Sequence, residues 1–220
     1  MSSFEFNVVS PAELTSTQLD DVVGIAVRAY DANPSIRAMS GGNKAIYGLF
    51  FRAVTRALVL EGKIWLAVSD SRIVGVLGGF GPGKFLWATQ AQRALGFDDA
   101  YARLSEETRD WWQNIYGPQI KEFMDGALEE TPEFKASLDG WMTPFLAVNP
   151  PYQRRGIATA MFKGMTSQAI HDKAIMVVSA DNDLNAHIYE TFGFQLKGQT
   201  VMASSVRVES YPLFALKKTP

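Results

Sequence analysis

The chain has 220 residues, of which 47% are hydrophobic and 20% are charged, a composition typical of one folded domain rather than of disordered or repetitive sequence. Its formal net charge is −2, it contains no cysteine and it has two histidines. These counts argue against a nucleic-acid-binding surface and a metal site, and they exclude disulfides and a cysteine nucleophile. The first residues contain no basic segment and no long apolar run, so we expect no secretory signal, no membrane segment and a cytoplasmic protein.

The first part of the chain predicts a strand and two helices. Residues 4–9 are typical of a short strand. Ser10 with Glu13 has the spacing of a helix capping box, so we expect a helix from there to about Tyr30. The apolar residues of about 43–61 recur at helical spacing, which predicts a second helix.

The next segments predict a β-hairpin followed by a helical insertion. The apolar runs "IWLAV" and "RIVGVLGG" flank a short polar "SDS", as strands of a hairpin do. Residues 84–139 are charged and rich in tryptophan and tyrosine, and we interpret them as a helical insertion within a single domain, 1–220. Trp111 and Trp112 would pack within the insertion or form an acceptor-pocket wall, a lid or a homodimer contact. Adjacent helical positions face different ways, so at most one of them need line a site.

The last part of the chain alternates strands and helices. "WMTPFLAV" predicts a strand, a helix follows to about Asp172, and the continuous apolar run "AIMVVSA" predicts a buried parallel strand. A short helix over 183–192 and closing strands over roughly 194–203 and 206–217 complete the order. Together these elements predict a mixed sheet flanked by helices, an α/β or mixed α+β layer architecture.

The loop before the third long helix has the features of an anion site. In "AVNPPYQRRGIATAMF", the first backbone N–H groups of the helix lack internal partners, and the helix dipole adds partial positive charge. Gly156 allows a ligand to approach closely, and Arg154 and Arg155 can add charge-assisted contacts. A phosphate or pyrophosphate fits this loop, and a solvated basic turn fits these features equally well.

Two motifs resemble those of the GNAT acetyltransferase superfamily. "VNPPYQRRGIA" resembles the coenzyme A pyrophosphate loop of that family, with one extra residue before Gln153. "NDLNAHIYETFGF" resembles its second signature, an asparagine leading into a helix and then Y-x-x-x-G-F. The two cover about residues 140–195. The resemblance implies a central mixed, mostly antiparallel sheet, with a V-shaped splay between two parallel strands.

The resemblance also implies acetyl-CoA as the cosubstrate. The backbone of Leu146 and Val148 would pair with the amides of the pantetheine arm, and the N–H groups from Arg154 to Ala158, with Thr159, would hold the pyrophosphate. The arginine side chains could also reach the 3′-phosphate of the adenosine. The implied cofactor residues are Leu146, Val148, Gln153, Arg154, Arg155, Gly156, Ile157, Ala158, Thr159, Asn182 and Asn185.

The implied reaction is acetyl transfer to a primary amine, with Tyr189 as the acid that protonates the departing thiolate. An alkyl ammonium titrates near ~10.4, so a general base or a desolvating pocket is required. The strand before the loop carries no carboxylate, which leaves the base open between a water relay and five other carboxylates, each expected to be a solvated surface charge. These five are Asp31, Glu130, Glu133, Asp139 and Asp181.

We therefore predict an N-acetyltransferase acting on a small-molecule amine, because an aromatic helical insertion would cover the acceptor side. Two alternatives keep the fold: a protein or peptide N-acetyltransferase with an open groove, and a non-catalytic acyl-CoA-binding module that has lost its base. The run "GGFGPGKF" has the spacing of a nucleotide-binding P-loop, but Phe85 stands where a hydroxyl should bind magnesium. That reading is disfavoured.

Overall fold

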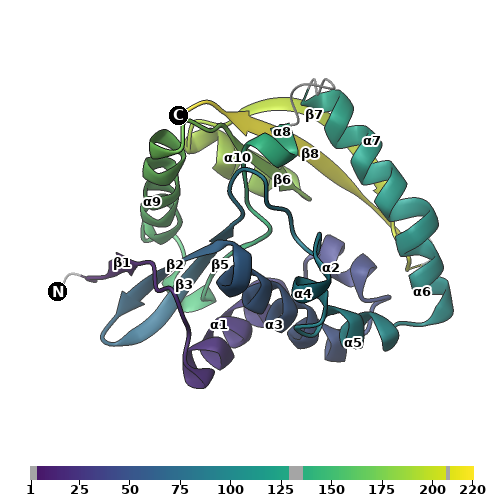
Figure 1. Ribbon diagram of the computed structural model, residues 1–220, viewed down its shortest axis with the longest axis horizontal. Helices are drawn as coiled ribbons and strands as arrows, with labels where there is room; N and C mark the ends of the chain where they lie inside the picture. Colours follow the sequence, from purple (N-terminus) through teal and green to yellow (C-terminus); the bar gives the residue numbers. More distant parts are fainter. Residues whose placement is uncertain (1–3, 129–135, 207–208) are drawn as a thin grey trace.

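The computed structural model describes residues 4–128, 136–206 and 209–220, which form two four-stranded sheets surrounded by helices (Figure 1). A β-bridge between Phe80 and Met142 connects the two sheets. The elements in chain order are β1 (Asn7–Val9), α1 (Ser16–Ala29), α2 (Pro34–Met39), α3 (Lys44–Glu61), β2 (Lys63–Ser69), β3 (Arg72–Gly79), α4 (Gln90–Arg93), α5 (Phe97–Ala102), α6 (Glu106–Trp111), the π-helix η1 (Trp112–Tyr116), α7 (Gly117–Ala127), α8 (Ala136–Asp139), β4 (Trp141–Met142), β5 (Leu146–Val148), the 3₁₀ turn η2 (Pro150–Tyr152), α9 (Ile157–His171), β6 (Met176–Ala180), α10 (Asp183–Thr191), β7 (Gln195–Ala203) and β8 (Ser210–Lys218).

The sheets confirm the predicted mixed, mostly antiparallel arrangement. The first has the order β1-β2-β3-β5 and all its pairs are antiparallel. Its β2–β3 hairpin turns at Asp70 and Ser71, both at positive φ, as a tight hairpin turn requires. The second has the order β4-β6-β8-β7, in which β4 and β6 are parallel and the other pairs antiparallel.

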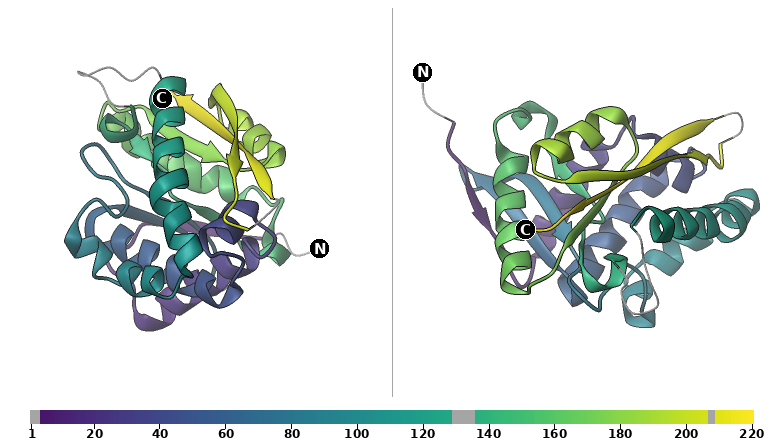
Figure 2. Two further views of the ribbon diagram at one scale, coloured as in Figure 1. Left: turned by 90° about the vertical axis from the view of Figure 1, so that its right-hand side faces the viewer. Right: turned by 90° about the horizontal axis from the view of Figure 1, so that it is seen from above.

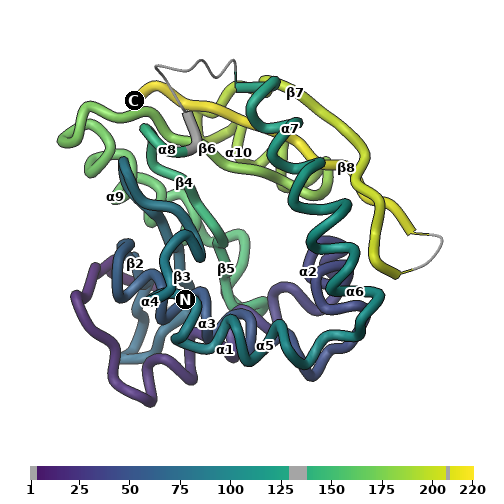
Figure 3. Tube along the Cα trace, turned by 45° about the vertical axis from the view of Figure 1, so that its right-hand side comes forward, coloured from purple at the N-terminus to yellow at the C-terminus, as the bar shows by residue number. Residues whose placement is uncertain are grey.

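The single strand expected over "WMTPFLAV" is wrong, because the chain changes sheets within it. β4 pairs with β6, whereas β5 pairs with β3 of the other sheet. Thr143 N donates to Val177 O at 3.2 Å, and Pro144, which has no N–H, cannot donate to the ladder after it. The strands β5 and β6 therefore diverge, which confirms the predicted V-shaped splay. Figure 3 shows the chain descending from β4 to β5, away from the sheet that contains β6.

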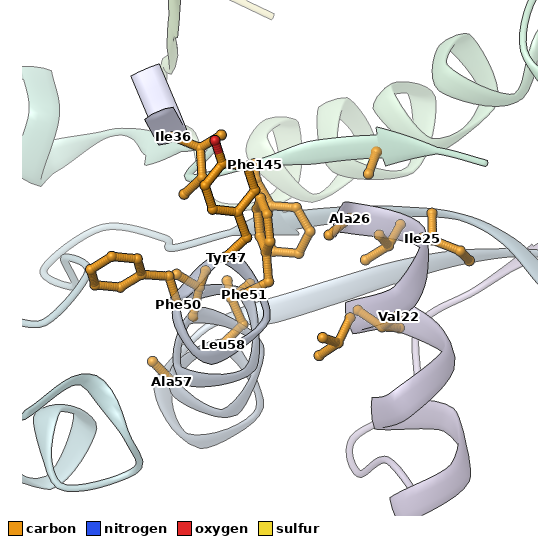
Figure 4. Packing of buried hydrophobic residues seen from close by; sticks show 14 of the residues in the cluster. Val22, Ile25, Ala26, Ile36, Tyr47, Phe50, Phe51, Ala57, Leu58 and Phe145 are labelled. Carbon is orange, nitrogen blue, oxygen red and sulfur yellow. The ribbon is translucent and has the colours of Figure 1, made fainter. Parts of the chain in front are cut away.

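Two hydrophobic clusters hold the helices against the sheets. In the first, α3 contributes Tyr47, Phe51 and Leu58, which pack with α1 and with Phe145 just before β5 (Figure 4). In the second, α9 packs on β2 and β3. A Cβ on Gly75 of β3 would lie 2.8 Å from the Ile157 side chain. Only glycine at this position lets the first turn of α9 lie so close to the sheet.

The N-terminal helices differ from the sequence prediction in two ways. The expected capping box of Ser10 and Glu13 is wrong: α1 begins at Ser16 with a capping box formed by Thr15 and Gln18. Ser10 Oγ instead donates to the Ile64 carbonyl at 2.7 Å. The sequence prediction also missed α2, which Asn33 caps and which begins at a proline, a common first helical residue.

The remaining expectations are largely confirmed. The described parts of residues 84–139 are mostly helical from α4 onward, and α7 lies against β7, where a Cβ on Gly198 would be 2.8 Å from Ala127 (Figure 2). The last strand begins at Ser210 rather than at 206. Within the described ranges, no helix combines the length and apolarity needed to span a bilayer.

The observed capping box predicts a measurable loss of stability. We expect Thr15→Ala to lower the free energy of unfolding by about 1 kcal/mol, because an N–H at the start of α1 loses its acceptor. Glu13→Ala, at an exposed site outside the box, should change it by less than about 0.5 kcal/mol. Urea unfolding midpoints at constant m-value measure both. Equal losses in the two variants would contradict the assigned start of α1.

Candidate active site

The N-terminus of α9 is open, as an anion site requires. Gly156 is the N-cap residue at φ +78°, and no described side chain caps the helix. A Cβ on Gly156 would meet nothing within 4 Å, and Arg154, Arg155 and Thr159 are exposed. The first N–H groups of α9 therefore face solvent with the positive end of the helix dipole, which fits a phosphate group.

Side chains beside this helix end are already ordered. The Arg155 guanidinium lies 4.7 Å from the centre of the Phe4 ring and 5.7 Å from that of Tyr152. Stacking on these rings holds its charge near the loop at little further entropic cost. Gln153 Nε2 donates to the Val148 carbonyl at 3.1 Å.

The backbone groups of Leu146 and Val148 point away from β3, so they are available to a ligand, as the predicted pantetheine contacts need. Asn149 N donates to Val74 O and Gly78 N to Phe145 O, so the alternating antiparallel ladder turns the N–H and C=O groups of Leu146 and Val148 away from β3. In this structure Tyr30 Oη donates to the Leu146 carbonyl at 3.1 Å and accepts from its N–H at 3.4 Å. Both backbone groups of Leu146, like the Val148 carbonyl, are therefore bonded to side chains, which a ligand can replace.

A cavity of about 360 Å³ lies at the divergence of the strands. Residues 142–145 and 179–181 form its floor, and α10 contributes Asn185 and Tyr189. Aromatic side chains form much of the opposite walls: Phe50 and Phe51 of α3, Trp87, Trp112, Tyr116 and Tyr211. Described residues between Phe85 and Ile120 thus contribute part of the wall, as expected of the insertion.

The two adjacent tryptophans have different roles. Trp112 lines the cavity and donates Nε1 to the Met39 carbonyl at 2.8 Å. Trp111 is buried elsewhere and donates Nε1 to the Ala203 carbonyl at 3.0 Å. Of the pair, Trp112 lines the cavity and Trp111 does not, as expected for adjacent positions on a helix.

Tyr189 is the predicted catalytic residue that the structure brings into the cavity wall. It is buried on α10, and no described residue forms a hydrogen bond with its hydroxyl that would hold it away from a ligand. Burial, with a smaller contribution from Asp181, raises the pKa of Tyr189. The phenol therefore stays protonated at neutral pH. Asn182 caps α10 by accepting from Asn185 N at 2.8 Å, so Asn182 has a structural role.

One of the five candidate carboxylates lies in this cavity. Asp181 is half-buried and lines it, so its expected place on the solvated surface is wrong. Asp31 is exposed and pairs with Lys44, and Asp139 is exposed. Glu130 and Glu133 lie outside the described residues.

Asp181 is held by two amides. Asn33 Nδ2 donates to Oδ2 at 2.7 Å and Asn182 Nδ2 to Oδ1 at 2.9 Å. These bonds favour the carboxylate, but burial outweighs them and raises the pKa of Asp181. The result is a carboxylate in a costly environment, as is common at functional sites.

Tyrosines from separate elements surround this carboxylate. Burial raises the pKa of Tyr30, Tyr116 and Tyr211, that of Tyr211 to about 12, and the charge of Asp181 contributes to each shift. The Tyr211 hydroxyl, next to that of Ser35, is buried without a hydrogen bond of ordinary geometry. The sequence analysis missed these three tyrosines and Asn33, since no motif contains them and only the fold brings them together.

The P-loop alternative is not supported by the local structure. Residues 80–88 contain no helix, and Lys84 Nζ lies 3.9 Å from a Glu61 carboxylate oxygen. Phe85 and Trp87 contribute instead to the cavity wall.

Comparisons with known proteins agree with this geometry. The family model described as the acetyltransferase (GNAT) family matches residues 46–194. A structure of histone acetyltransferase HPA2 and related acetyltransferase from Corynebacterium glutamicum superimposes with a TM-score of 0.61 at 16% identity, covering 98% of this chain and 96% of that one. A Drosophila melanogaster polyamine N-acetyltransferase gives 0.61 at 10% identity, with 97% and 100% covered.

A putative acetyltransferase from Salmonella typhimurium, solved with its cofactor acetyl-CoA, gives a TM-score of 0.55 at 9% identity, with 97% and 93% covered. The sequence has no significant match among curated proteins. At these identities the structures establish the shared fold.

The raised pKa of Asp181 predicts a pH-dependent stability difference from Asp181→Asn. A carboxyl whose pKa is higher in the folded than in the unfolded chain destabilises the fold as pH rises from about 4, the ordinary pKa, through the raised one. The free energy of unfolding of the wild type should therefore fall relative to that of the variant over this range. The loss of a hydrogen-bond acceptor in the variant changes its stability by an amount that does not depend on pH, so it does not affect this slope. Unfolding measured from pH 4 to 8 gives this slope, and a difference that grows in favour of the wild type would contradict the shift. The surrounding tyrosines do not titrate in this range.

Proposed function

The chain belongs to the acetyltransferase (GNAT) family, and on that premise we propose that it transfers an acetyl group from acetyl-CoA to a primary amine of a small molecule. The observation that carries this proposal is the aromatic cavity at the divergence of β5 and β6, with Tyr189 in its wall. Acetyl-CoA, when bound, supplies the acetyl group as a thioester. The protein must hold it, admit the amine and manage the protons.

The residues for holding the coenzyme suit its two polar parts. The open N–H groups from Gly156 to Thr159, with Arg154 and Arg155 beside them, would hold the pyrophosphate. The outward backbone groups of Leu146 and Val148 would hold the amides of the pantetheine arm, after exchange with Tyr30 and Gln153. In this exchange the backbone groups of β5 would change one set of hydrogen bonds for another, so the strand edge would stay paired.

Tyr189 would supply the proton needed by the departing sulfur. Its pKa is raised, so Oη holds its proton across the neutral range. Because a phenol with a raised pKa is a weak acid, the transferred proton must be replaced quickly. The amine, which loses protons as its nitrogen becomes an amide, is the source of the replacement.

The cavity favours a small molecule over a peptide. Its volume of about 360 Å³ is in the range of small-molecule sites, and Trp87 and Trp112 form part of its wall. A protein acetyltransferase needs an open groove for the chain on both sides of the amine. A non-catalytic module is disfavoured by the polar groups Tyr189 and Asp181 inside an otherwise aromatic cavity.

Thiol release from acetyl-CoA tests the proposed activity. The protein is incubated with acetyl-CoA and a panel of amino acids, polyamines, arylalkylamines, aminoglycosides and peptides. We expect amine-dependent release with at least one small amine. Release only with peptides would favour the protein-acetylating alternative. Coenzyme binding without release for any amine would favour the non-catalytic one.

A pair of glycines tests the coenzyme site. Gly156 and Gly83 are both exposed, have φ near +78° and +77°, and have open space around a Cβ. Leucine at either should cost a similar ~1–2 kcal/mol of stability. Gly156→Leu should also weaken coenzyme A binding about tenfold or more, the equivalent of one charge-assisted hydrogen bond, whereas Gly83→Leu should not. Calorimetric titration measures both, and equal affinities would refute the site.

Tyr189→Phe tests the proton donor. We expect kcat to fall by about 10²-fold or more, the usual contribution of a positioned acid, with little change in coenzyme affinity. Tyr101→Phe is the control, because that hydroxyl donates to the Arg109 carbonyl and Tyr101 does not line the cavity. An undiminished kcat for Tyr189→Phe would remove Tyr189 from the mechanism.

A further inference from the structure

We propose that Asp181 binds the amino group of the acceptor, and that the acceptor is a primary amine with a single positive charge on an apolar, aromatic-sized body. This inference rests on the proposed function and specifies the substrate class of the same cavity. It follows from which charges the cavity contains and which it lacks.

The cavity contains one acidic side chain and no basic one among the described residues that line it. The acid is Asp181, which Asn33 and Asn182 hold in place. The phenols of Tyr30, Tyr116, Tyr189 and Tyr211 are kept neutral by their raised pKa values. A partly buried carboxylate without a cationic partner is the natural site for a substrate ammonium.

The remaining walls suit an apolar body. Phe50, Trp87 and Trp112 form a triangle of rings with centres 5.9–6.2 Å apart, and all three line the cavity. Aromatic faces bind apolar or aromatic groups through burial and tolerate a nearby cation through cation–π attraction. The arrangement therefore provides one ionic contact and one broad apolar contact.

The same composition excludes other amines. A polyamine would bring further ammonium groups into a cavity with a single carboxylate, and each unpaired buried charge is costly. An amino acid would bring a carboxylate into a cavity without a cation, next to the charge of Asp181. Both classes should bind more weakly than a monoamine of the same size.

Asp181 can also take the first proton of the ammonium. Burial raises the pKa of the carboxyl and lowers that of an ammonium in the same cavity, so the two approach each other. The transfer converts an ammonium and a carboxylate into a neutral amine and a carboxylic acid, which later releases the proton to water. Asp181 would then be the general base that the sequence alone leaves open.

Binding of matched amines without acetyl-CoA tests this proposal independently of activity. The amines are 2-phenylethylamine; phenylalanine, which adds only a carboxylate; and spermidine, which carries further charges and has no ring. We expect 2-phenylethylamine to raise the melting temperature and to bind by calorimetric titration about tenfold or more tightly than the other two. Equal binding of all three, or preferred binding of spermidine, would overturn the substrate class.

Two variants test the role of Asp181. Asp181→Asn should weaken 2-phenylethylamine binding about 30-fold or more, the lower end of what removing one partner of a buried charge pair costs. Its binding should also lose the rise with pH that the wild type shows as the carboxyl ionises. Asp31→Asn, an exposed site outside the cavity, should change neither. Unchanged amine affinity in Asp181→Asn, with a folded variant by circular dichroism, would overturn the assignment.

The experiments distinguish a failure of the proposed acetyl transfer from a failure of the proposed amine site. Selective, Asp181-dependent amine binding without thiol release would refute the acetyl transfer and leave the amine site standing. Thiol release with polyamines or amino acids, unaffected by Asp181→Asn, would support the proposed function and refute the amine site.

Discussion

The divergence of β5 from β6 is the constraint on which the rest of the site depends. If the chain continued from β4 alongside β6, its backbone groups would pair with β6 and no gap would open between β5 and β6. Pro144 removes a donor at this point, and Phe145 anchors the chain in the first core instead. The edge this creates is costly unless its groups find partners. Tyr30 and Gln153 provide those partners for Leu146 and Val148, and both are side chains that can move when a ligand offers the same bonds.

The gap also explains how the carboxylate of Asp181 can be held in a partly buried position, which is unfavourable for a charge. Asp181 follows directly on β6, and the fold brings Asn33 across to it from the start of α2, 148 residues earlier. The amide bonds keep the carboxylate oriented but do not cancel its burial, so its pKa stays raised. The buried carboxylate lowers the stability of the fold, and a positively charged ligand that pairs with it would restore that stability. This is the usual balance between stability and function at a binding site.

Local sequence signals predicted the parts of the fold that local chemistry determines. The β2–β3 hairpin, α3, α9, β6 and α10 follow from periodicity, turn residues and caps within each segment. The start of α1 failed because two capping boxes compete within nine residues, and Thr15 with Gln18 forms where Ser10 with Glu13 does not. The break in "WMTPFLAV" could have been inferred from Pro144, which is rare inside central strands.

The two halves of the candidate site also differ in how far the local sequence predicts them. The coenzyme side is one continuous segment, from β5 through Gly156 into α9, so a motif could identify it. The acceptor side is assembled from the residue that follows α1, from α2 and α3, from residues between 85 and 120, and from β8, and no spacing in the sequence connects them. Asp181 and Tyr189 belong to both halves, because β6 and α10 form one wall of the divergence and also face the aromatic rings. The chemistry can therefore stay fixed on β6 and α10, while substitutions in the distant walls change which amine fits.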